Sequence, residues 1–216
     1  MKPHTALRSI ISRYGRLAAV YDHRWSRYTQ QTIEEAIGAL GVPEDGCGLD
    51  VGCGTGEFVR LAKERWPSTF WAGVDPAPAM LAVARRKCVD TPGVRFLAAG
   101  AERLPFVSGI FHAVVSLNVL HHLENPEWFL AECQRVLRPS GLLVLVDWCR
   151  DFWHCRLTHG WYRLTDRTYV RMYRLGEMAD LLAKAGFVPE GARRFTAFPL
   201  YGMMRVCARR MGWAVN

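Results

Sequence analysis

Hydrophobic residues in the middle of this 216-residue chain come in short runs separated by stretches with a helical pattern. The strands expected from the runs are Cys47–Val51, Phe70–Val74, Val94–Ala98, Ala113–Leu117 and Leu142–Asp147. In the stretches between them, apolar residues recur every three or four positions, as on one face of a helix. The helices expected there are Glu57–Arg65, Ala79–Lys87 and Glu127–Leu137. This alternation is typical of βαβ units built around a parallel sheet.

The pattern changes on both sides of this central region. The first 40 residues have a helical pattern, whereas residues 148–175 are rich in Trp, Tyr, Phe and Arg and show no clear period. A helix is expected at Glu177–Ala185, followed by strands near Arg194–Phe198 and Met203–Ala208. The whole pattern predicts an α/β fold in which a seven-stranded, mostly parallel sheet carries helices on both faces.

A single domain accounts for the length, since domains of about 100–200 residues are usual. Within it we expect four parts. They are a helical lid over residues 1–40, a ligand-binding core over residues 41–147, an aromatic and basic cap over residues 148–175, and a last helix with closing strands over residues 176–216.

The composition is that of a packed globular protein, with 50% hydrophobic and 22% charged residues. The longest apolar stretch, Gly141–Val146, is far shorter than the roughly 20 residues that a membrane span needs. Arg8, Arg13 and Arg16 interrupt the first apolar residues, so no signal peptide is expected. An Arg-rich start without acidic residues is also typical of a transit peptide, and that alternative stays open.

The seven cysteines favour neither a disulfide framework nor a zinc site, because their number is odd and no Cys-x-x-Cys pair occurs. Cys149, His154 and Cys155 form a cluster of metal-ligand types, but their spacing fits no common site, so no metal is expected. Buried, reduced thiols in a cytoplasmic protein are the expectation.

The formal net charge of +8 is unevenly distributed. Residues 1–22 carry +3, residues 23–149 carry −2 and residues 150–216 carry +7. Basic ends favour an anionic partner, which leaves an acidic substrate, a membrane surface and RNA as candidates. A solvated basic face without a partner is the other interpretation.

A glycine-rich turn links the first expected strand to the first helix after it. In Gly52-Cys53-Gly54-Thr55-Gly56, glycines at alternate positions allow a tight turn and a close approach of backbone to ligand. The helix start offers free N–H groups to a negative group. A dinucleotide-binding turn would have its third glycine one residue later, where Glu57 stands. Asp75, at the end of the second strand, is well spaced to accept hydrogen bonds from the ribose hydroxyls of a nucleoside.

Five ordered motifs resemble those of class I S-adenosylmethionine (SAM)-dependent methyltransferases. They are LDVGCGTGEF at the first turn, GVDPAPAML in the ribose segment, AERLPF in the adenine segment, LNVLHHL at the fourth strand and RVLRPSGLL before the fifth. The resemblance covers residues 14–147 and is nearest to the small-molecule group that includes the ubiquinone and menaquinone C-methyltransferases. It implies a Rossmann-like fold and SAM as the cofactor, with S-adenosylhomocysteine as the product.

The resemblance also implies cofactor contacts. Around the first turn they are Asp50, Gly52, Cys53, Gly54 and Gly56, with Asp50 holding the methionine amino group through water. Beyond that turn they are Tyr21 in the lid, Asp75 at the ribose, Pro76, Met80, Ala101 and Glu102 at the adenine, and Leu117 and Asn118 below the methyl donor.

Three positions depart from the family pattern. Gly100 stands where the family usually has an Asp that binds the adenine amino group, so Ala101 or Glu102 must serve or the affinity is lower. His112 replaces an Asp with a structural role, and Ser140 replaces the first glycine of a Pro-Gly-Gly turn, a change that a turn tolerates.

Methyl transfer from a sulfonium is an in-line displacement, so alignment supplies much of the rate. A base is needed only where the acceptor must lose a proton. The candidates are His121 and His122, just past the fourth strand, and Asp147, at the end of the fifth. Open α/β sheets place their sites at this carboxyl edge, and a His backed by a carboxylate is a suitable base for a phenol or alcohol. The sequence does not choose between the two histidines, nor between catalysis and local hydrogen bonding.

The segment 148–175 is the expected acceptor-binding part. Its aromatic and cationic residues suit a small aromatic or lipophilic acceptor that carries negative charge, such as a quinol or phenol. They equally suit peripheral contact with an anionic membrane, or a structural cluster with solvated arginines. The residues are Trp148, Phe152, Trp153, Trp161, Tyr162, Tyr169 and Tyr173, with Arg150, Arg156, Arg163, Arg167, Arg171 and Arg174.

Two other functions compete with this interpretation. An RNA methyltransferase would explain the basic ends, but Leu117-Asn118-Val119-Leu120 stands where amino-group methylases of nucleic acids carry Asn/Asp-Pro-Pro-aromatic, so nucleic acid is not the expected partner. A non-catalytic partner protein that binds SAM is the second alternative. The sequence gives no indication of the oligomeric state.

Overall fold

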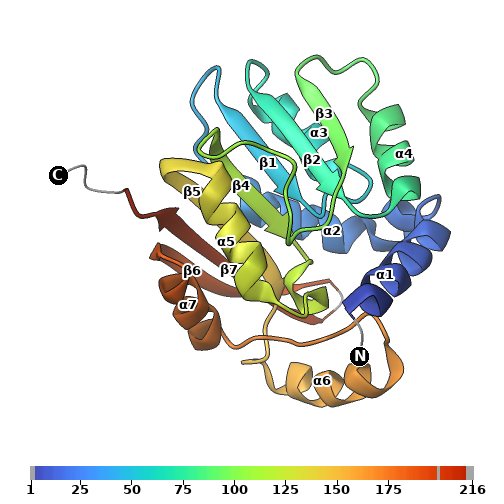
Figure 1. Cartoon of the computed structure of the whole chain (residues 1–216). Helices are drawn as coiled ribbons and strands as arrows, with labels where there is room; N and C mark the ends of the chain where they lie inside the picture. The colour runs from blue at the N-terminus through green and yellow to red at the C-terminus, as the bar shows by residue number, and fades with distance from the viewer. Residues whose placement is uncertain (1–2, 199, 213–216) are drawn as a thin grey trace.

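The computed structural model describes residues 3–198 and 200–212, and its centre is a seven-stranded sheet with the order β3-β2-β1-β4-β5-β7-β6 (Figure 1). The strands are β1 Cys47–Val51, β2 Phe70–Asp75, β3 Val94–Ala98, β4 Phe111–Leu117, β5 Leu137–Trp148, β6 Phe187–Ala197 and β7 Tyr201–Arg210. The strands from β3 through β5 pair in parallel. The strand β7 runs in the opposite direction, so its pairings with β5 and β6 are antiparallel. The predicted seven-stranded, mostly parallel α/β sheet is confirmed.

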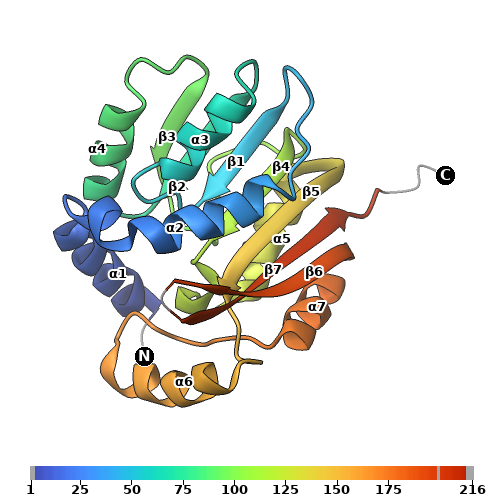
Figure 2. The same cartoon turned by 180° about the vertical axis from the view of Figure 1, so that it is seen from behind.

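Helices cover both faces of this sheet. They are α1 Pro3–Leu17, α2 Tyr21–Ile37, α3 Glu57–Arg65, α4 Pro78–Lys87, α5 Pro126–Val136, α6 Trp153–Thr165 and α7 Leu175–Lys184, with a 3₁₀ turn, η1, at Leu120–His122. The helices α5 and α7 lie on the face seen in Figure 1, and α2 and α3 on the face seen in Figure 2. The predicted arrangement with helices on both faces is confirmed.

The alternation of side chains along each strand produces two cores. Leu49 and Val51 of β1 are buried against Phe129 and other residues of α5, whereas Trp71 of β2 is buried on the other face among residues of α2 and α3. A Cβ at Gly48 would overlap the Trp71 ring, so the close approach of the strand to this ring requires glycine.

The expected elements of the central region match the structure to within a few residues, but three regions differ. The strand β6 begins at Phe187, well before the expected start at Arg194. The strand β5 begins at Leu137, because the chain enters the sheet directly after α5, with a register shift against β4 and with Ser140 at a left-handed φ of 61°. The segment 148–175, which showed no period, contains the helix α6. Cys155 and Tyr162 face inward on α6 while Trp161 is exposed, and these two apolar faces hide the helical period.

The carboxyl ends of the parallel strands meet where α1, α2 and η1 pass over the sheet (Figure 1). Ala18, Tyr14 and Tyr21 from the start of the chain pack on Ala77 and Met80 at the beginning of α4. Among the described residues, no helix is long and apolar enough to cross a membrane.

Candidate active site

Three glycines with left-handed backbone shape the turn after β1. Their φ values are 79° at Gly52, 51° at Gly54 and 76° at Gly56. A Cβ at Gly52 would collide with Val119, and one at Gly56 would lie 2.9 Å from the Cβ of Ala84. A Cβ at Gly54, by contrast, would meet no atom within 4 Å. The first and third glycines are therefore required by packing, and the second leaves open space for a ligand.

Asp75 closes this turn from the end of β2. Its Oδ2 accepts the Gly54 N–H at 3.0 Å and its Oδ1 accepts the Ala77 N–H at 2.8 Å. Burial raises the pKa of this carboxyl, and the two N–H donors act in the opposite direction. Asp75 is thus held rigidly with its carboxylate at the cavity beside Gly54.

Asp50 is 2% exposed, and no hydrogen bond reaches its carboxylate from the residues that the structure describes. Burial, followed by the charge of Asp75, raises the pKa of Asp50 well above its usual value. A buried acid without a partner is costly unless a ligand supplies a donor. An ammonium group would do so, and the methionine end of SAM carries one, so this residue fits the cofactor.

A cavity at the carboxyl edge contains most of the residues that the resemblance assigned to the cofactor. Those that line it are Tyr21, Gly52, Gly54, Asp75, Pro76, Met80, Ala101, Leu117 and Asn118. Sequence reasoning had not assigned Leu7, Ile10, Tyr14, Ala99, Val119 and Leu123, which also line it.

Four of the assigned residues do not line the cavity. Asp50 is buried within β1, and Gly56 is the N-cap of α3. The Cys53 side chain is buried towards Gly73 of β2, and burial raises the pKa of its thiol well above the usual value. Glu102 is hydrogen-bonded to Asn125, and burial raises the pKa of its carboxyl.

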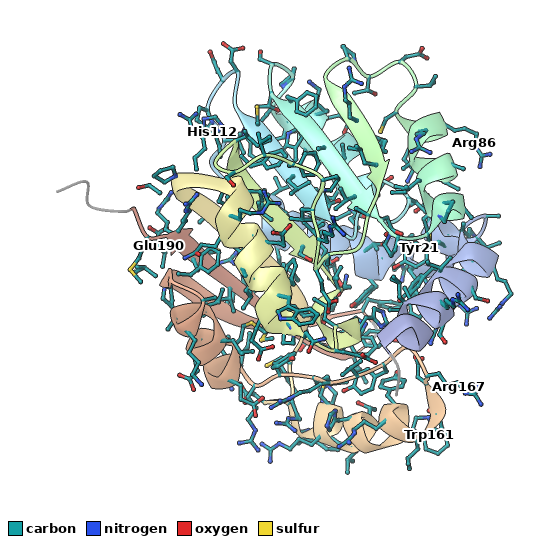
Figure 3. All side chains as sticks on the ribbon, in the orientation of Figure 1. Tyr21, Arg86, His112, Trp161, Arg167 and Glu190 are labelled. Carbon is teal, nitrogen blue, oxygen red and sulfur yellow. The ribbon has the colours of Figure 1, made fainter. Side chains whose placement is uncertain are left out.

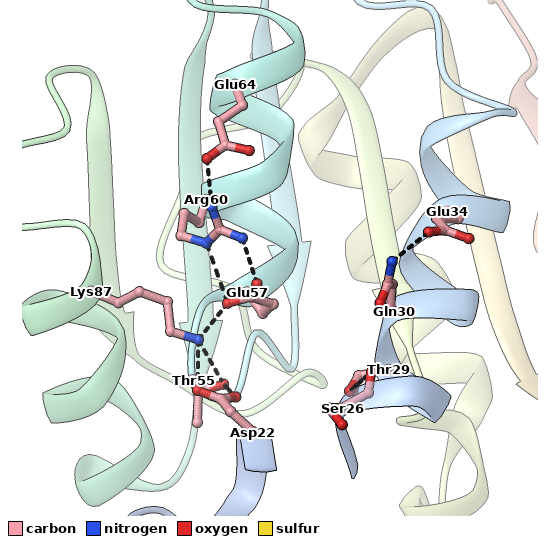
Figure 4. A network of polar contacts seen from close by, with 10 residues as sticks. All are labelled: Asp22, Ser26, Thr29, Gln30, Glu34, Thr55, Glu57, Arg60, Glu64 and Lys87. Atoms are coloured by element: carbon pink, nitrogen blue, oxygen red, sulfur yellow. Dashed lines mark hydrogen bonds and ion pairs between the residues drawn. The ribbon is translucent and has the colours of Figure 1, made fainter. Parts of the chain in front are cut away.

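Charged side chains fasten the start of α2 to the glycine-rich turn (Figure 4). Thr55 Oγ1 donates to Asp22 at 2.5 Å, and Lys87 Nζ lies 2.8 Å from Asp22 and 2.6 Å from Glu57. Arg60 completes the network by pairing with Glu57 at 2.7 Å. These contacts hold α2, and with it Tyr21, over the cofactor cavity.

A second, largely aromatic cavity adjoins the first. The two share Tyr14, Tyr21, Asn118 and His122 as lining residues. The other residues around the second cavity are Arg13, Leu17, Trp25, Tyr28, His121, Trp148, Tyr162, Asp166 and Tyr201. A ligand here would lie directly beside a cofactor in the first cavity.

His121 forms a buried pair with Asp147 at the wall of this aromatic cavity. The Nδ1 of His121 lies 2.7 Å from Asp147 Oδ1, and the ring stacks on Trp148 at 4.2 Å and 7°. Because the carboxylate accepts only, Nδ1 carries a proton, and in the neutral form of the ring Nε2 keeps a free lone pair. No described side chain binds Nε2, so this nitrogen is available to a ligand in the cavity.

His122 has both ring nitrogens engaged. Its Nδ1 donates to the Thr168 carbonyl at 2.5 Å, and its Nε2 accepts the Tyr14 hydroxyl proton at 2.7 Å. Burial, followed by the influence of His121, lowers the pKa of His122 to about 3, so the ring stays neutral. The structure therefore separates two adjacent histidines that the sequence left equivalent.

Asn118 is oriented from behind by a tyrosine. The Tyr28 hydroxyl donates to Asn118 Oδ1 at 2.5 Å and accepts the Trp148 Nε1–H at 2.8 Å. Asn118 itself has a left-handed φ of 60°, a conformation that asparagine tolerates better than most residues. Its amide nitrogen remains available at the junction of the two cavities.

Sequence reasoning missed several residues of the aromatic cavity. Arg13 and Asp166 form an ion pair across it, and Trp25, Tyr28 and Tyr201 complete its walls. A usable signal exists for Tyr28, since it follows Tyr21 by seven residues on α2 and so shares a face of that helix with it. Tyr201 lies far along the chain and becomes a neighbour only through the pairing of β7 with β5.

The cluster of Cys149, His154 and Cys155 forms no metal site among the residues that the structure describes. The Cys149 thiol contacts Asp151 at 3.6 Å and the Cys155 thiol contacts the Gly202 carbonyl at 3.7 Å. All seven cysteines are unpaired, and six of them are buried.

The strand order β3-β2-β1-β4-β5-β7-β6 is that of the class I methyltransferase fold. Residues 49–145 match a family model described as a methyltransferase domain. The segment is therefore a SAM-dependent methyltransferase domain.

Curated relatives share this domain. A demethylmenaquinone methyltransferase of Thermus thermophilus is 44% identical over 101 residues, which cover 46% of each chain. A malonyl-[acyl-carrier protein] O-methyltransferase of Laribacter hongkongensis is 34% identical over 148 residues, covering 64% of this chain and 50% of the relative. The chain thus spans about half the length of these relatives.

Among solved structures, the chain is similar to one chain of a complex between the Haloferax volcanii Trm112 methyltransferase activator and a putative methyltransferase. The TM-score is 0.81 at 18% identity, covering 92% of this chain and 97% of the other. At this identity the similarity concerns the fold alone.

Proposed function

We propose that this protein is a SAM-dependent methyltransferase whose acceptor is a small aromatic or lipophilic hydroxyl compound, a quinol or phenol. The buried pair of His121 and Asp147 carries this proposal, because it offers a free imidazole Nε2 to an aromatic cavity beside the cofactor cavity. A hydroxyl with a pKa near that of phenol requires such a base.

The chain's own residues account for binding of the donor. Asp75 would accept hydrogen bonds from the ribose hydroxyls, Asp50 would hold the ammonium group through a water molecule, and Met80 would pack on the adenine. When bound, SAM supplies an electrophilic methyl group on a sulfur that leaves as a neutral thioether. Leu117 and Asn118, which line the cofactor cavity, would lie below that methyl group, and Asn118 also lines the aromatic cavity.

His121 takes the acceptor proton. Its Nε2 removes the hydroxyl proton while Asp147 stabilises the imidazolium that forms. Loss of the proton increases the electron density of the oxygen and of the ring carbons conjugated with it, so either atom type can accept the methyl group. Flat rings of Trp148, Tyr162 and Tyr201 hold the acceptor by stacking.

His122 and Tyr14 are positioning residues. The neutral imidazole, fixed by the Thr168 carbonyl, orients the Tyr14 hydroxyl. The pKa of Tyr14 lies far above its usual value because the side chain is buried, so the phenol remains a donor.

Replacement of His121 tests this function. In an S-adenosylhomocysteine-coupled assay with a panel of quinols and phenols, His121→Asn should lower kcat by about 100-fold or more, the usual contribution of a general base. Affinity for S-adenosylhomocysteine should stay nearly constant, because His121 does not line the cofactor cavity. Raising the pH should partly restore turnover, since the hydroxyl then ionises without a base.

His23→Asn is the matched control, because His23 is exposed on α2 and should leave turnover unchanged. Unchanged turnover in His121→Asn would contradict the role of His121 as the base.

An RNA methyltransferase and a non-catalytic SAM-binding partner protein remain the alternatives. The aromatic cavity favours neither of them, because its stacked walls are suited to one small planar ligand.

A further inference from the structure

The outer face of α6 has no partner in the described chain, and it is apolar. Trp153, Leu157, Trp161 and Leu164 are 71%, 70%, 66% and 87% exposed. At 100° per residue these four side chains fall within an arc of roughly 80° on one side of the helix. Large apolar side chains gathered on an exposed helix face mark an interaction site rather than ordinary surface.

The opposite face of the same helix belongs to the acceptor cavity. Tyr162 lines the cavity and stacks on Trp148 at 5.3 Å, and Cys155 is buried beside Tyr169 and Met172. The single helix α6 therefore separates the cavity from the surroundings of the molecule.

Positive charge borders the apolar face. Residues 152–175 contain five arginines and one aspartate. The aspartate, Asp166, is already paired with Arg13, whereas Arg163 and Arg167 have no ion pair among the described residues. Figure 3 shows Trp161 and Arg167 at the same outer edge of the molecule, away from the sheet.

We propose that α6 lies on an anionic lipid bilayer, with its tryptophans and leucines in the interface and its arginines on the headgroups. A helix with a narrow Trp/Leu face and flanking arginines suits this position, where indole rings are favoured and anionic lipids attract cations. A protein partner is less favoured, because the apolar side chains form one narrow stripe that arginines border. If the proposed function holds, a lipophilic acceptor leaves the bilayer beside α6 and enters the cavity past Tyr162.

Vesicle binding in the absence of SAM and acceptor tests this surface independently of catalysis. The intact chain should co-sediment with phosphatidylglycerol-containing vesicles and not with pure phosphatidylcholine vesicles, and salt should weaken binding. Its tryptophan fluorescence should shift to the blue, and brominated lipid should quench it. The double variant Trp153→Ser/Trp161→Ser should bind at least tenfold more weakly, as should Arg163→Glu/Arg167→Glu.

Trp128→Ser is the matched control, because Trp128 is 60% exposed on a different helix, α5, and this variant should bind vesicles as the unaltered chain does. Retained S-adenosylhomocysteine binding verifies that each variant is folded. Equal binding to both vesicle types, no binding, or full binding by the double tryptophan variant would overturn the proposal. The proposal would also be overturned if the chain did not bind vesicles but formed a concentration-dependent dimer, and if the tryptophan substitutions abolished that dimer.

Discussion

At the scale of single residues, adjacent positions have opposite roles. His121 and His122 follow one another in a 3₁₀ turn, so their side chains project in different directions. His121 pairs with Asp147 and keeps one ring nitrogen free, whereas both ring nitrogens of His122 are hydrogen-bonded, to Thr168 and Tyr14. The sequence located both histidines at the correct sheet edge but could not separate them, because their partners come from β5, α1 and the loop after α6.

Gly100 gives a residue-scale prediction. It lines the cofactor cavity, and a Cβ there would meet no atom within 4 Å, so a side chain fits without strain. Gly100→Asp should bind S-adenosylhomocysteine roughly fivefold more tightly in calorimetry, because the new carboxylate can accept the adenine amino group for about 1 kcal/mol net.

Gly100→Ala is the control for backbone stiffening, since it adds a Cβ without an acceptor. Equal gains in both variants would assign the effect to the backbone, and no gain in Gly100→Asp would place the adenine elsewhere.

At the scale of elements, the sequence predicted what local periodicity determines. The strands β1 to β4 and the helices α3 to α5 were found to within a few residues, because each buries one face against one sheet. The helix α6 was missed because its two faces are both apolar, one turned inward and one outward. Tyr28 and Tyr201, two walls of the aromatic cavity, were missed for a different reason, since they meet only through tertiary packing.

The link between α2 and the glycine-rich turn gives an element-scale prediction. Asp22→Ala removes the acceptor for Thr55 and the partner of Lys87, which frees the start of α2. We expect faster amide hydrogen exchange in α2 around Trp25 and S-adenosylhomocysteine binding weakened several-fold. The free energy of unfolding should fall by less than about 1 kcal/mol, because the ion pair is partly exposed.

Glu34→Ala provides the comparison on the same helix, because Glu34 bonds only Gln30 within α2, at 2.9 Å. If Glu34→Ala accelerates exchange and weakens binding as much as Asp22→Ala, the link is not what holds the helix over the cavity.

At the scale of the whole molecule, one sheet edge unites the two parts of the site. The parallel strands bring the turn after β1, Asp75 and Asn118 to the donor side, and the reversal of β7 brings Tyr201 to the acceptor side. Part of the positive charge near the end of the sequence lies beside α6, since arginines of the segment 148–175 border the exposed face of this helix.

The central claim is that the cavity at this edge binds SAM through Asp75. Titration calorimetry of S-adenosylhomocysteine measures it directly, with Asp75→Ala compared with the exposed control Trp128→Ser. We predict one site per chain in the unaltered protein and in the control, at least tenfold weaker binding in Asp75→Ala because a buried hydrogen-bonding carboxylate is lost, and no displacement by NADH. Absence of binding in the unaltered chain, or undiminished binding in Asp75→Ala, would contradict the account.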